Sequence, residues 1–128
     1  MIWLLVGAGG ALGSVARHGL NQLIHERNLS STFPLGIFIV NVVGSAAIGL
    51  LAGLVGSSRW TMSLESRAFL IVGVLGGFTT FSTFSFDTFA LVRDGHLAQA
   101  VWNAAGQVLL SLAAVSIGYR IASTIWRG

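Results

Sequence analysis

The sequence GGFTTFSTFSFDTF occupies residues 76–89 and sets the character of the whole chain. It holds five of the eight phenylalanines and many hydroxyl side chains, inside a segment that is otherwise apolar. Adjacent glycines and threonines weaken a helix locally, because glycine costs backbone entropy and threonine loses side-chain freedom. Lipid tolerates loosened backbone only where protein buries it or where it lines a wet cavity. A helix broken here, followed by rings and hydroxyls, is a candidate path for an ion or a small solute.

The spacing of the rings leaves a plainer interpretation open. Phe81 and Phe84 are three residues apart and lie on roughly one helix face, with Ser82 and Ser85 displaced around it. Phenylalanines at helical spacing commonly pack against neighbouring helices. Hydroxyls in a helix commonly bond to carbonyls one turn earlier. Spacing alone therefore favours packing for an arbitrary membrane helix, and a pore needs further evidence.

Composition places the chain in a membrane. Of 128 residues, 54% are hydrophobic and 9% are charged, and the mean hydropathy is +0.81. A soluble domain needs about a quarter of its residues charged, and one bilayer crossing takes about 20 apolar residues. We expect an all-α integral membrane protein with one four-helix domain over residues 1–128, whose third helix is broken. The expected spans are 2–24, 35–55, 67–92 and 97–125.

Several classes of function are excluded by what the sequence lacks. Cysteine is absent, so disulfides and thiolate metal sites cannot form. The excess charge of +3 is carried by arginine alone and is too sparse for a nucleic-acid surface. The three histidines lack metal-ligand spacing, and no Ser/His/Asp set has supporting context, so we expect no enzyme. Met1–Trp3 carries no positive charge, so we expect the first span to be retained rather than cleaved.

Small and polar residues mark the inward faces of the first two spans. Gly9 and Gly13 form a small-xxx-small pair that lets another helix approach closely. Arg17 continues that face; an interfacial anchor and a role in drawing anions to an entrance both remain open. In the second span Asn41 begins a four-residue repeat that continues as Ser45, Gly49 and Gly53. A buried amide needs partners, and spacing favours an interhelical hydrogen bond for Asn41.

The last two spans carry further polar groups. Asp87 is the one acid inside a span; an ordinary helix-end role is favoured over a proton relay. Asn103, Gln107 and Ser111 recur every four residues in the fourth span. Polar side chains in lipid must face protein or water, so this stripe is expected to point inward.

Charges near the span ends indicate no strong orientation in the membrane. Four spans put both termini on one side, together with Arg59, Arg67, Arg120 and Arg127. The other side has Arg27 and Arg93, with Arg17 approaching it. This bias is weak for the positive-inside rule, so the chain can insert both ways. Trp3, Trp60 and Trp126 fit interfacial aromatic belts. Small-residue faces favour a twofold homodimer, and opposite insertion puts its axis in the membrane plane.

Three motifs together resemble the Fluc (CrcB) family of small bacterial fluoride channels. They are Gly9-x-x-x-Gly13-x-x-x-Arg17, then Gly36-x-x-x-Val40-Asn41-x-x-Gly44, then the run from Gly76 to Phe84. The last run is highly specific, whereas the first two are weak alone. The resemblance covers the whole chain.

The resemblance implies a passive channel that exports cytoplasmic fluoride through two pores of an antiparallel, dual-topology homodimer in the bacterial inner membrane. The implied fluoride-pore residues are Phe81, Phe84, Asn41, Thr80, Ser82, Asn103, Gln107 and Ser111. Arg17 is implied at the anion entrance or in a structural role. A structural sodium ion is implied at the dimer centre, on backbone carbonyls of Gly76 and Thr79 from both copies. The implied partners are fluoride, membrane lipid and a second copy, with no nucleic acid.

The physical chemistry of fluoride agrees with these residues. Fluoride is a small anion that holds water tightly, so a pore must offer compact donors in place of its hydration shell. Phenylalanine is electropositive at its ring edge and can stabilise an anion without a fixed charge. The sequence departs from the family pattern at Ile37, where threonine is frequent, and at Val115, where a hydroxyl would extend the polar track. Asn103 and Gln107 stand where aromatic and hydroxyl side chains are familiar, so the span-four lining is expected to differ.

Two other functions remain as alternatives. A small multidrug-type proton-coupled exporter is also a compact four-span protein that can insert both ways. It needs a carboxylate in its first span, which has no acid here, and Asp87 lies in the wrong helix. A non-transporting membrane assembly subunit is the second alternative, and it predicts no ion flux.

Overall fold

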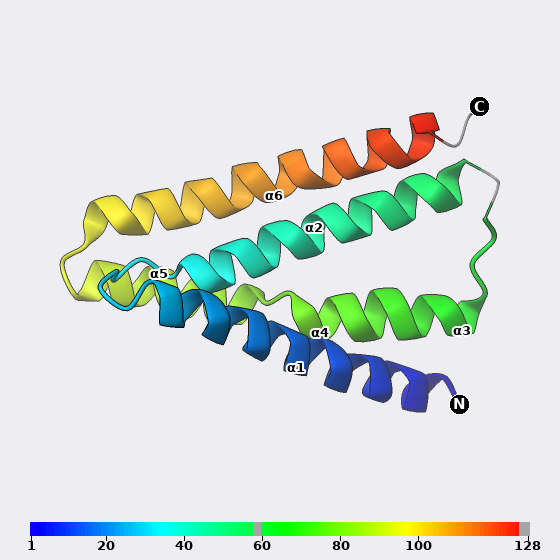
Figure 1. Ribbon diagram of the computed structural model, residues 1–128, viewed down its shortest axis with the longest axis horizontal. Coiled ribbons are helices and arrows are strands. Elements are labelled where there is room, and N and C mark those ends of the chain that lie inside the picture. The colour runs from blue at the N-terminus through cyan, green and yellow to red at the C-terminus, as the bar shows by residue number, and fades with distance from the viewer. Residues whose placement is uncertain (58–59, 126–128) are drawn as a thin grey trace.

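The computed structural model describes residues 1–57 and 60–125, and those residues form helices and short connections without a strand. Arg59, Trp126 and Arg127, which the orientation argument used, lie outside the described residues. The elements follow one another as α1 (Ile2–Arg27), α2 (Leu35–Gly56), α3 (Leu64–Arg67), η1 (Ala68–Leu75), α4 (Gly76–Phe78), α5 (Phe81–Arg93) and α6 (Leu97–Ile125). The helices from α3 to α5 form one long stretch that is interrupted between α4 and α5 (Figure 1).

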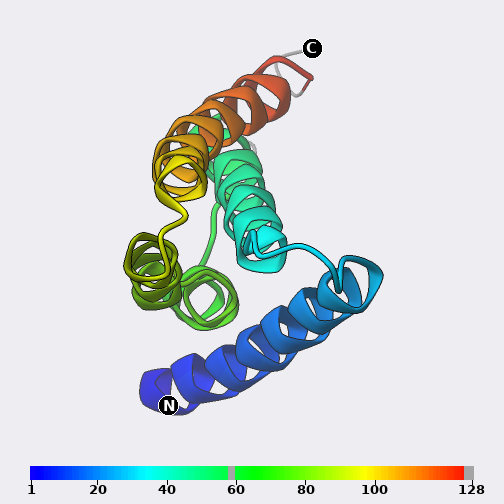
Figure 2. The same ribbon diagram turned by 90° about the vertical axis from the view of Figure 1, so that its left-hand side faces the viewer.

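The helices are arranged as an up-and-down bundle. The start of α1, the facing ends of α2 and α3, and the end of α6 lie at one end (Figure 1). The connections from α1 to α2 and from α5 to α6 lie at the other end. Figure 2 shows α2 and α6 side by side, with α1 crossing beneath the stretch that contains α4. This is the arrangement that consecutive membrane crossings produce.

Three stretches are long and apolar enough to cross a membrane. They are Leu35–Gly56, Leu64–Arg93 and Leu97–Ile125. The helix α1 has 26 residues, but its second half carries Arg17, His18 and Gln22, and it is not among the three. The chain is therefore a multi-pass membrane protein, and the crossing by α1 stays a prediction.

Glycines let α1 approach the third stretch closely. Gly9 and Gly13 are the buried residues of α1. A Cβ atom on Gly9 would lie 3.0 Å from the Gly73 Cα atom, and one on Gly73 would lie 2.9 Å from the Gly9 Cα atom. Real Cβ atoms essentially never come this close to backbone, so each position needs glycine. The four-residue spacing in the sequence predicts this face of α1 correctly.

The pair α2 and α6 packs backbone to backbone in the same way. A Cβ atom on Gly53 of α2 would lie 2.5 Å from the Tyr119 carbonyl oxygen. A Cβ atom on Gly118 of α6 would lie 2.6 Å from the Ala46 carbonyl oxygen. The glycine half of the repeat in α2 therefore packs against α6. The polar half, Asn41 and Ser45, faces a cavity.

The element η1 is a π-helix, which the sequence does not predict. In it the backbone hydrogen bonds run to the carbonyl five residues earlier, so the turns are wider than in an α-helix. Such segments are rare and often lie next to functional sites. Here η1 is followed by the short helix α4 and then by the interruption of the third stretch.

Candidate functional site

The break in the third stretch consists of two threonines in extended conformation. Thr79 has φ −82° and ψ 155°, and Thr80 has φ −152° and ψ 120°. The Thr79 hydroxyl donates to the Leu75 carbonyl at 3.0 Å and closes the end of α4. The Thr80 hydroxyl accepts from the Thr83 backbone N–H at 3.2 Å and caps the start of α5. The two threonine hydroxyls therefore supply hydrogen-bond partners at the end of α4 and at the start of α5, and so stabilise the interruption.

The glycine pair does not itself break the helix. Gly76 has helical angles of φ −63° and ψ −37°, and Gly77 belongs to α4. A Cβ atom on Gly77 would lie 2.5 Å from the Gly10 carbonyl oxygen and 3.0 Å from the Gly10 Cα atom. This glycine is needed for contact with α1, and the two threonines that follow carry the interruption.

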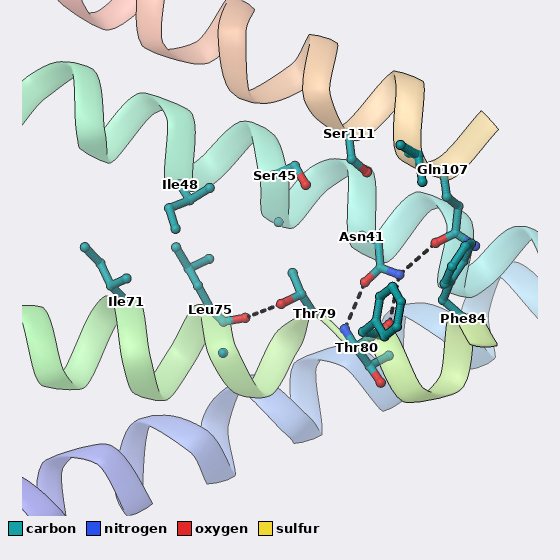
Figure 3. A pocket seen from close by; sticks show the side chains of 14 residues that line it. Asn41, Ser45, Ile48, Ile71, Leu75, Thr79, Thr80, Phe84, Gln107 and Ser111 are labelled. Carbon is teal, nitrogen blue, oxygen red and sulfur yellow. Dashed lines mark hydrogen bonds between the residues drawn. The ribbon is translucent and has the colours of Figure 1, made fainter. Parts of the chain in front are cut away.

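Asn41 of α2 holds the break from the side (Figure 3). Its Nδ2 atom donates to the Thr80 carbonyl at 3.1 Å and to Gln107 Oε1 at 2.8 Å. Its Oδ1 atom accepts from the Thr80 N–H at 2.9 Å. The amide thus pairs with both backbone groups of one residue, as a neighbouring strand would. The interhelical hydrogen bond predicted for Asn41 is confirmed, and both of its donor hydrogens are used.

Several backbone carbonyls at the break have lost their usual helical donors, and those of Gly76 and Thr79 are among them. In an α-helix each carbonyl accepts from the N–H four residues later. The Thr80 N–H, which would serve Gly76, donates to Asn41 instead. The Thr83 N–H, which would serve Thr79, donates to the Thr80 hydroxyl instead. The oxygens of Gly76 and Thr79 are therefore free to accept from another group or to bind a cation.

A cavity of about 380 Å³ lies beside the break, between α2, η1, α5 and α6. One water occupies about 30 Å³ in the liquid, so the space exceeds the needs of a single small ion and its near waters. Its walls are mostly apolar, and its polar groups gather where Asn41, Thr80 and Gln107 meet (Figure 3). The lining residues are Asn41, Gly44, Ser45, Ile48, Ile71, Leu75, Gly76, Thr79, Thr80, Phe81, Phe84, Gln107, Val108 and Ser111.

The electrostatics of this cavity favour an anion. The rings of Phe81 and Phe84 both line it, with centroids 5.4 Å apart and planes inclined by 44°. Rings at such an angle present edges as well as faces, and ring edges are electropositive. The first turn of α5 starts at Phe81, and the start of a helix carries partial positive charge. Among the described lining residues there is no lysine or arginine, so no fixed charge is present to trap an anion.

The structure brings six of the eight predicted pore residues together at the cavity and places the other two elsewhere. Those lining it are Asn41, Thr80, Phe81, Phe84, Gln107 and Ser111. Ser82 is exposed, and its hydroxyl lies 3.2 Å from the Thr80 hydroxyl. Asn103 is completely buried behind the lining. Gly76 and Thr79, predicted for sodium, also line the cavity.

Arg17 lies on α1 and is not among the residues that line the cavity. It is half-buried and makes no hydrogen bond or ion pair with any residue in the described ranges. Both roles considered for this residue, an interfacial anchor and an anion entrance, stay predictions.

Thr88 is the polar group near the site that sequence reasoning missed. Its hydroxyl donates to the Phe84 carbonyl at 2.8 Å and accepts from Asn103 Nδ2 at 2.9 Å. Asn103 Oδ1 in turn accepts from Gln107 Nε2 at 2.9 Å. The signal that could have found it is spacing, because Thr88 follows Phe81 by two helical turns and shares its face.

Asp87 lies in a separate hollow of about 150 Å³ near the connection from α5 to α6. Thr32, Asp94 and His96 line the same hollow. Asp94 accepts from the Arg93 guanidinium at 2.9 Å, and this hydrogen bond lowers the pKa of the Asp94 carboxyl. Over residues 1–57 and 60–125, no group of three or more His, Asp or Glu side chains could hold a metal ion.

Comparisons with known proteins agree with this geometry. Residues 4–119 match the family described as CrcB-like protein, Camphor Resistance (CrcB). A protein of Nitrobacter winogradskyi is 47% identical over 122 residues, which cover 95% of each chain. A protein of Thermus thermophilus is 44% identical, with 96% of each chain covered. One of Opitutus terrae is 44% identical, with 92% of this chain and 89% of the relative covered. All three relatives are named fluoride-specific ion channel FluC. The chain is a member of the CrcB family.

Proposed function

We propose that the chain is a fluoride channel of a bacterial inner membrane, which lets cytoplasmic fluoride leave passively down its electrochemical gradient. The single observation that carries the proposal is the cavity at the helix break, where two phenylalanine rings, hydroxyls and a helix start converge. The names of the relatives support it. Since those relatives are ion channels, the chain is not an enzyme.

Dehydration is the barrier that such a pore must lower. Fluoride gives up tightly held water only if compact donors replace it. The Ser111 hydroxyl and the second hydrogen of the Gln107 amide are donors of this kind along the cavity. Phe81 and Phe84 offer ring edges to the same space. Weak, repeated contacts of this sort allow an anion to enter and also to leave.

We further propose that two copies associate antiparallel, so that the dimer has two pores. Phe81 lines the cavity, yet 78% of its surface is exposed in the single chain. A second copy would cover that open side. Among described residues, Arg67 and Arg120 lie at one end of the bundle, whereas Arg17, Arg27 and Arg93 lie toward the other. With Arg59 and Arg127 of the sequence added to the first group, the bias is weak and does not oppose insertion both ways.

The free carbonyls of Gly76 and Thr79 fit the structural sodium ion that the motifs imply. Neutral oxygens without helical donors suit a hard monovalent cation, and one copy supplies a single pair of them from Gly76 and Thr79. Two copies that meet at this point would supply both pairs. A bound sodium ion would add positive charge, which offsets repulsion between anions in neighbouring pores.

Replacing sodium with a bulky organic cation is therefore expected to lower fluoride efflux without changing the order of anion preference. The reason is that a large cation cannot fit between carbonyls at a helix break. Efflux from liposomes would be measured after prolonged dialysis against each cation, with the sodium buffer restored afterwards as the control. Efflux that is the same in both buffers after exchange would count against the sodium site.

The function itself is tested with purified protein in liposomes loaded with potassium fluoride or potassium chloride. A potassium ionophore removes the charge barrier, so anion movement alone limits efflux. We expect rapid fluoride efflux and chloride efflux no faster than from protein-free liposomes. Equal efflux of both anions would contradict fluoride selectivity. No efflux would favour an assembly subunit, and drug-coupled proton uptake would favour the multidrug-type exporter.

A further inference from the structure

A continuous row of hydrogen bonds leaves the break and runs away from the cavity through buried side chains. It passes from Asn41 to Gln107 at 2.8 Å, from Gln107 to Asn103 at 2.9 Å, and from Asn103 to Thr88 at 2.9 Å. It ends where the Thr88 hydroxyl donates to the Phe84 carbonyl at 2.8 Å. We call this row the amide relay. It joins α2, α6 and α5 around the site.

The direction of the relay is fixed at its far end. The Thr88 hydroxyl has one hydrogen and donates it to the Phe84 carbonyl. The hydroxyl oxygen can therefore only accept from Asn103. Asn103 must then present its NH₂ group to Thr88 and its oxygen to Gln107. Gln107 must present its NH₂ group to Asn103 and its oxygen to Asn41.

The orientation of Gln107 matches that of Asn41 beside the break. With Gln107 Oε1 as the acceptor, Asn41 presents its NH₂ group to Gln107 and its oxygen to the Thr80 N–H. The Thr80 N–H, which can only donate, fixes Asn41 in the same orientation from the other end. The two ends of the relay therefore agree, and Thr88 is the group that accepts from the NH₂ of the buried Asn103.

Burial makes this orientation hard to reverse. Asn103 has no exposed surface, and Gln107 is 3% exposed. No buried side-chain nitrogen or oxygen in the described part of the chain lacks a partner. A flipped amide would put oxygen against oxygen where no water can intervene, and a buried group without its partner is costly.

We propose that Thr88 and Asn103 are positioning residues for fluoride conduction, although neither lines the cavity. The proposal rests on the proposed channel function. Gln107 lines the cavity. The Gln107 Nε2 atom carries two hydrogens and donates one of them to Asn103 Oδ1. The relay thus leaves an N–H donor on Gln107 for an anion, whereas a reversed amide would present an oxygen that repels it.

The test compares Thr88→Val, which keeps the shape and removes the hydroxyl, with Thr88→Ser, which restores it. We expect Thr88→Val to lower the rate of fluoride efflux roughly tenfold, as loss of a buried hydrogen-bond partner does. Thr88→Ser should retain a rate within about twofold of the original. Ser85→Ala is the matched control, because the Ser85 hydroxyl also bonds back to a carbonyl one turn earlier but lies outside the relay.

A double substitution separates positioning from simple support of the fold. In a Gln107→Ala background the relay is already cut, so adding Thr88→Val should lower efflux no further. A purely structural role would give the same proportional loss in both backgrounds, and that result would overturn the proposal. So would an equal loss in Ser85→Ala, or full efflux in Thr88→Val. If Thr88→Val does not assemble, Thr88→Ala replaces it with the same expectations.

Failure of this proposal is distinguishable from failure of the proposed function. If the unaltered protein passes no fluoride, the channel function is wrong. If the unaltered protein passes fluoride and Thr88→Val passes it equally fast, only the positioning role is wrong.

Discussion

Asn41→Leu is expected to lower fluoride efflux at least about a hundredfold, because three hydrogen bonds at the break are lost together. Leucine has a similar volume but cannot pair with either backbone group of Thr80. The Thr80 N–H and carbonyl and the Gln107 oxygen would all be left without this partner. Thr80 would then be free to leave the extended conformation, and the cavity wall that it forms would change shape.

Two measurements on Asn41→Leu separate a loss of conduction from a loss of stability. Fluoride efflux from liposomes gives the loss of conduction, and the midpoint of thermal unfolding in detergent shows whether the break has been loosened. We expect both to fall, whereas Asn28→Ala should change neither by much. Within residues 1–57 and 60–125, the side-chain amide of Asn28 bonds to the Ile24 carbonyl at the end of α1 and to no other group. A normal melting midpoint with lost efflux would mean that Asn41 acts on conduction by positioning Thr80 and Gln107 and contributes little to stability. Normal efflux would contradict the importance of the hydrogen bonds between Asn41 and Thr80 for conduction.

The helices of this chain could be predicted closely from the sequence. The predicted segments 2–24, 35–55 and 97–125 correspond to α1 at Ile2–Arg27, α2 at Leu35–Gly56 and α6 at Leu97–Ile125. Long apolar runs separated by short polar connections are a strong signal, because lipid requires each backbone group to bond within its own helix. The four-residue glycine spacings are almost as informative, since they show where two backbones can touch.

The third stretch was harder to predict, because its shape depends on neighbours. Helix propensity points to Gly76 and Gly77 as the weak positions, yet both are helical because α1 packs against this segment. Thr79 and Thr80 break the helix because their hydroxyls cap both ends and Asn41 supplies the missing backbone partner. The π-helix η1 likewise leaves no pattern in the sequence.

The polar stripe of α6 shows a second limit of sequence reasoning. A repeat of four residues correctly predicts that Asn103, Gln107 and Ser111 point inward. It cannot distinguish a side chain that faces a cavity from one that faces another helix, because that depends on the position of α5. Asn103 donates a hydrogen bond to Thr88 and is buried, whereas Ser111 lines the cavity.

Phe81→Ile and Phe84→Ile are each expected to lower fluoride efflux about tenfold or more while the protein stays assembled. Isoleucine retains apolar bulk but has no electropositive ring edge. In a cavity with no lysine or arginine among its described lining residues, the rings contribute a large part of the positive field that an anion meets. Removing one ring therefore raises the barrier for a dehydrated anion and leaves the packing nearly unchanged.

Phe86→Ile is the matched control for both substitutions. Phe86 is on the same helix and is 61% exposed, but it does not line the cavity. Size-exclusion chromatography would show assembly, which matters most for Phe81, because the surface that it exposes in one chain is where a second copy is proposed to lie. Unchanged efflux in both Phe81→Ile and Phe84→Ile would mean that the rings only pack. The donors of Gln107 and Ser111 would then have to replace the hydration shell of fluoride by themselves.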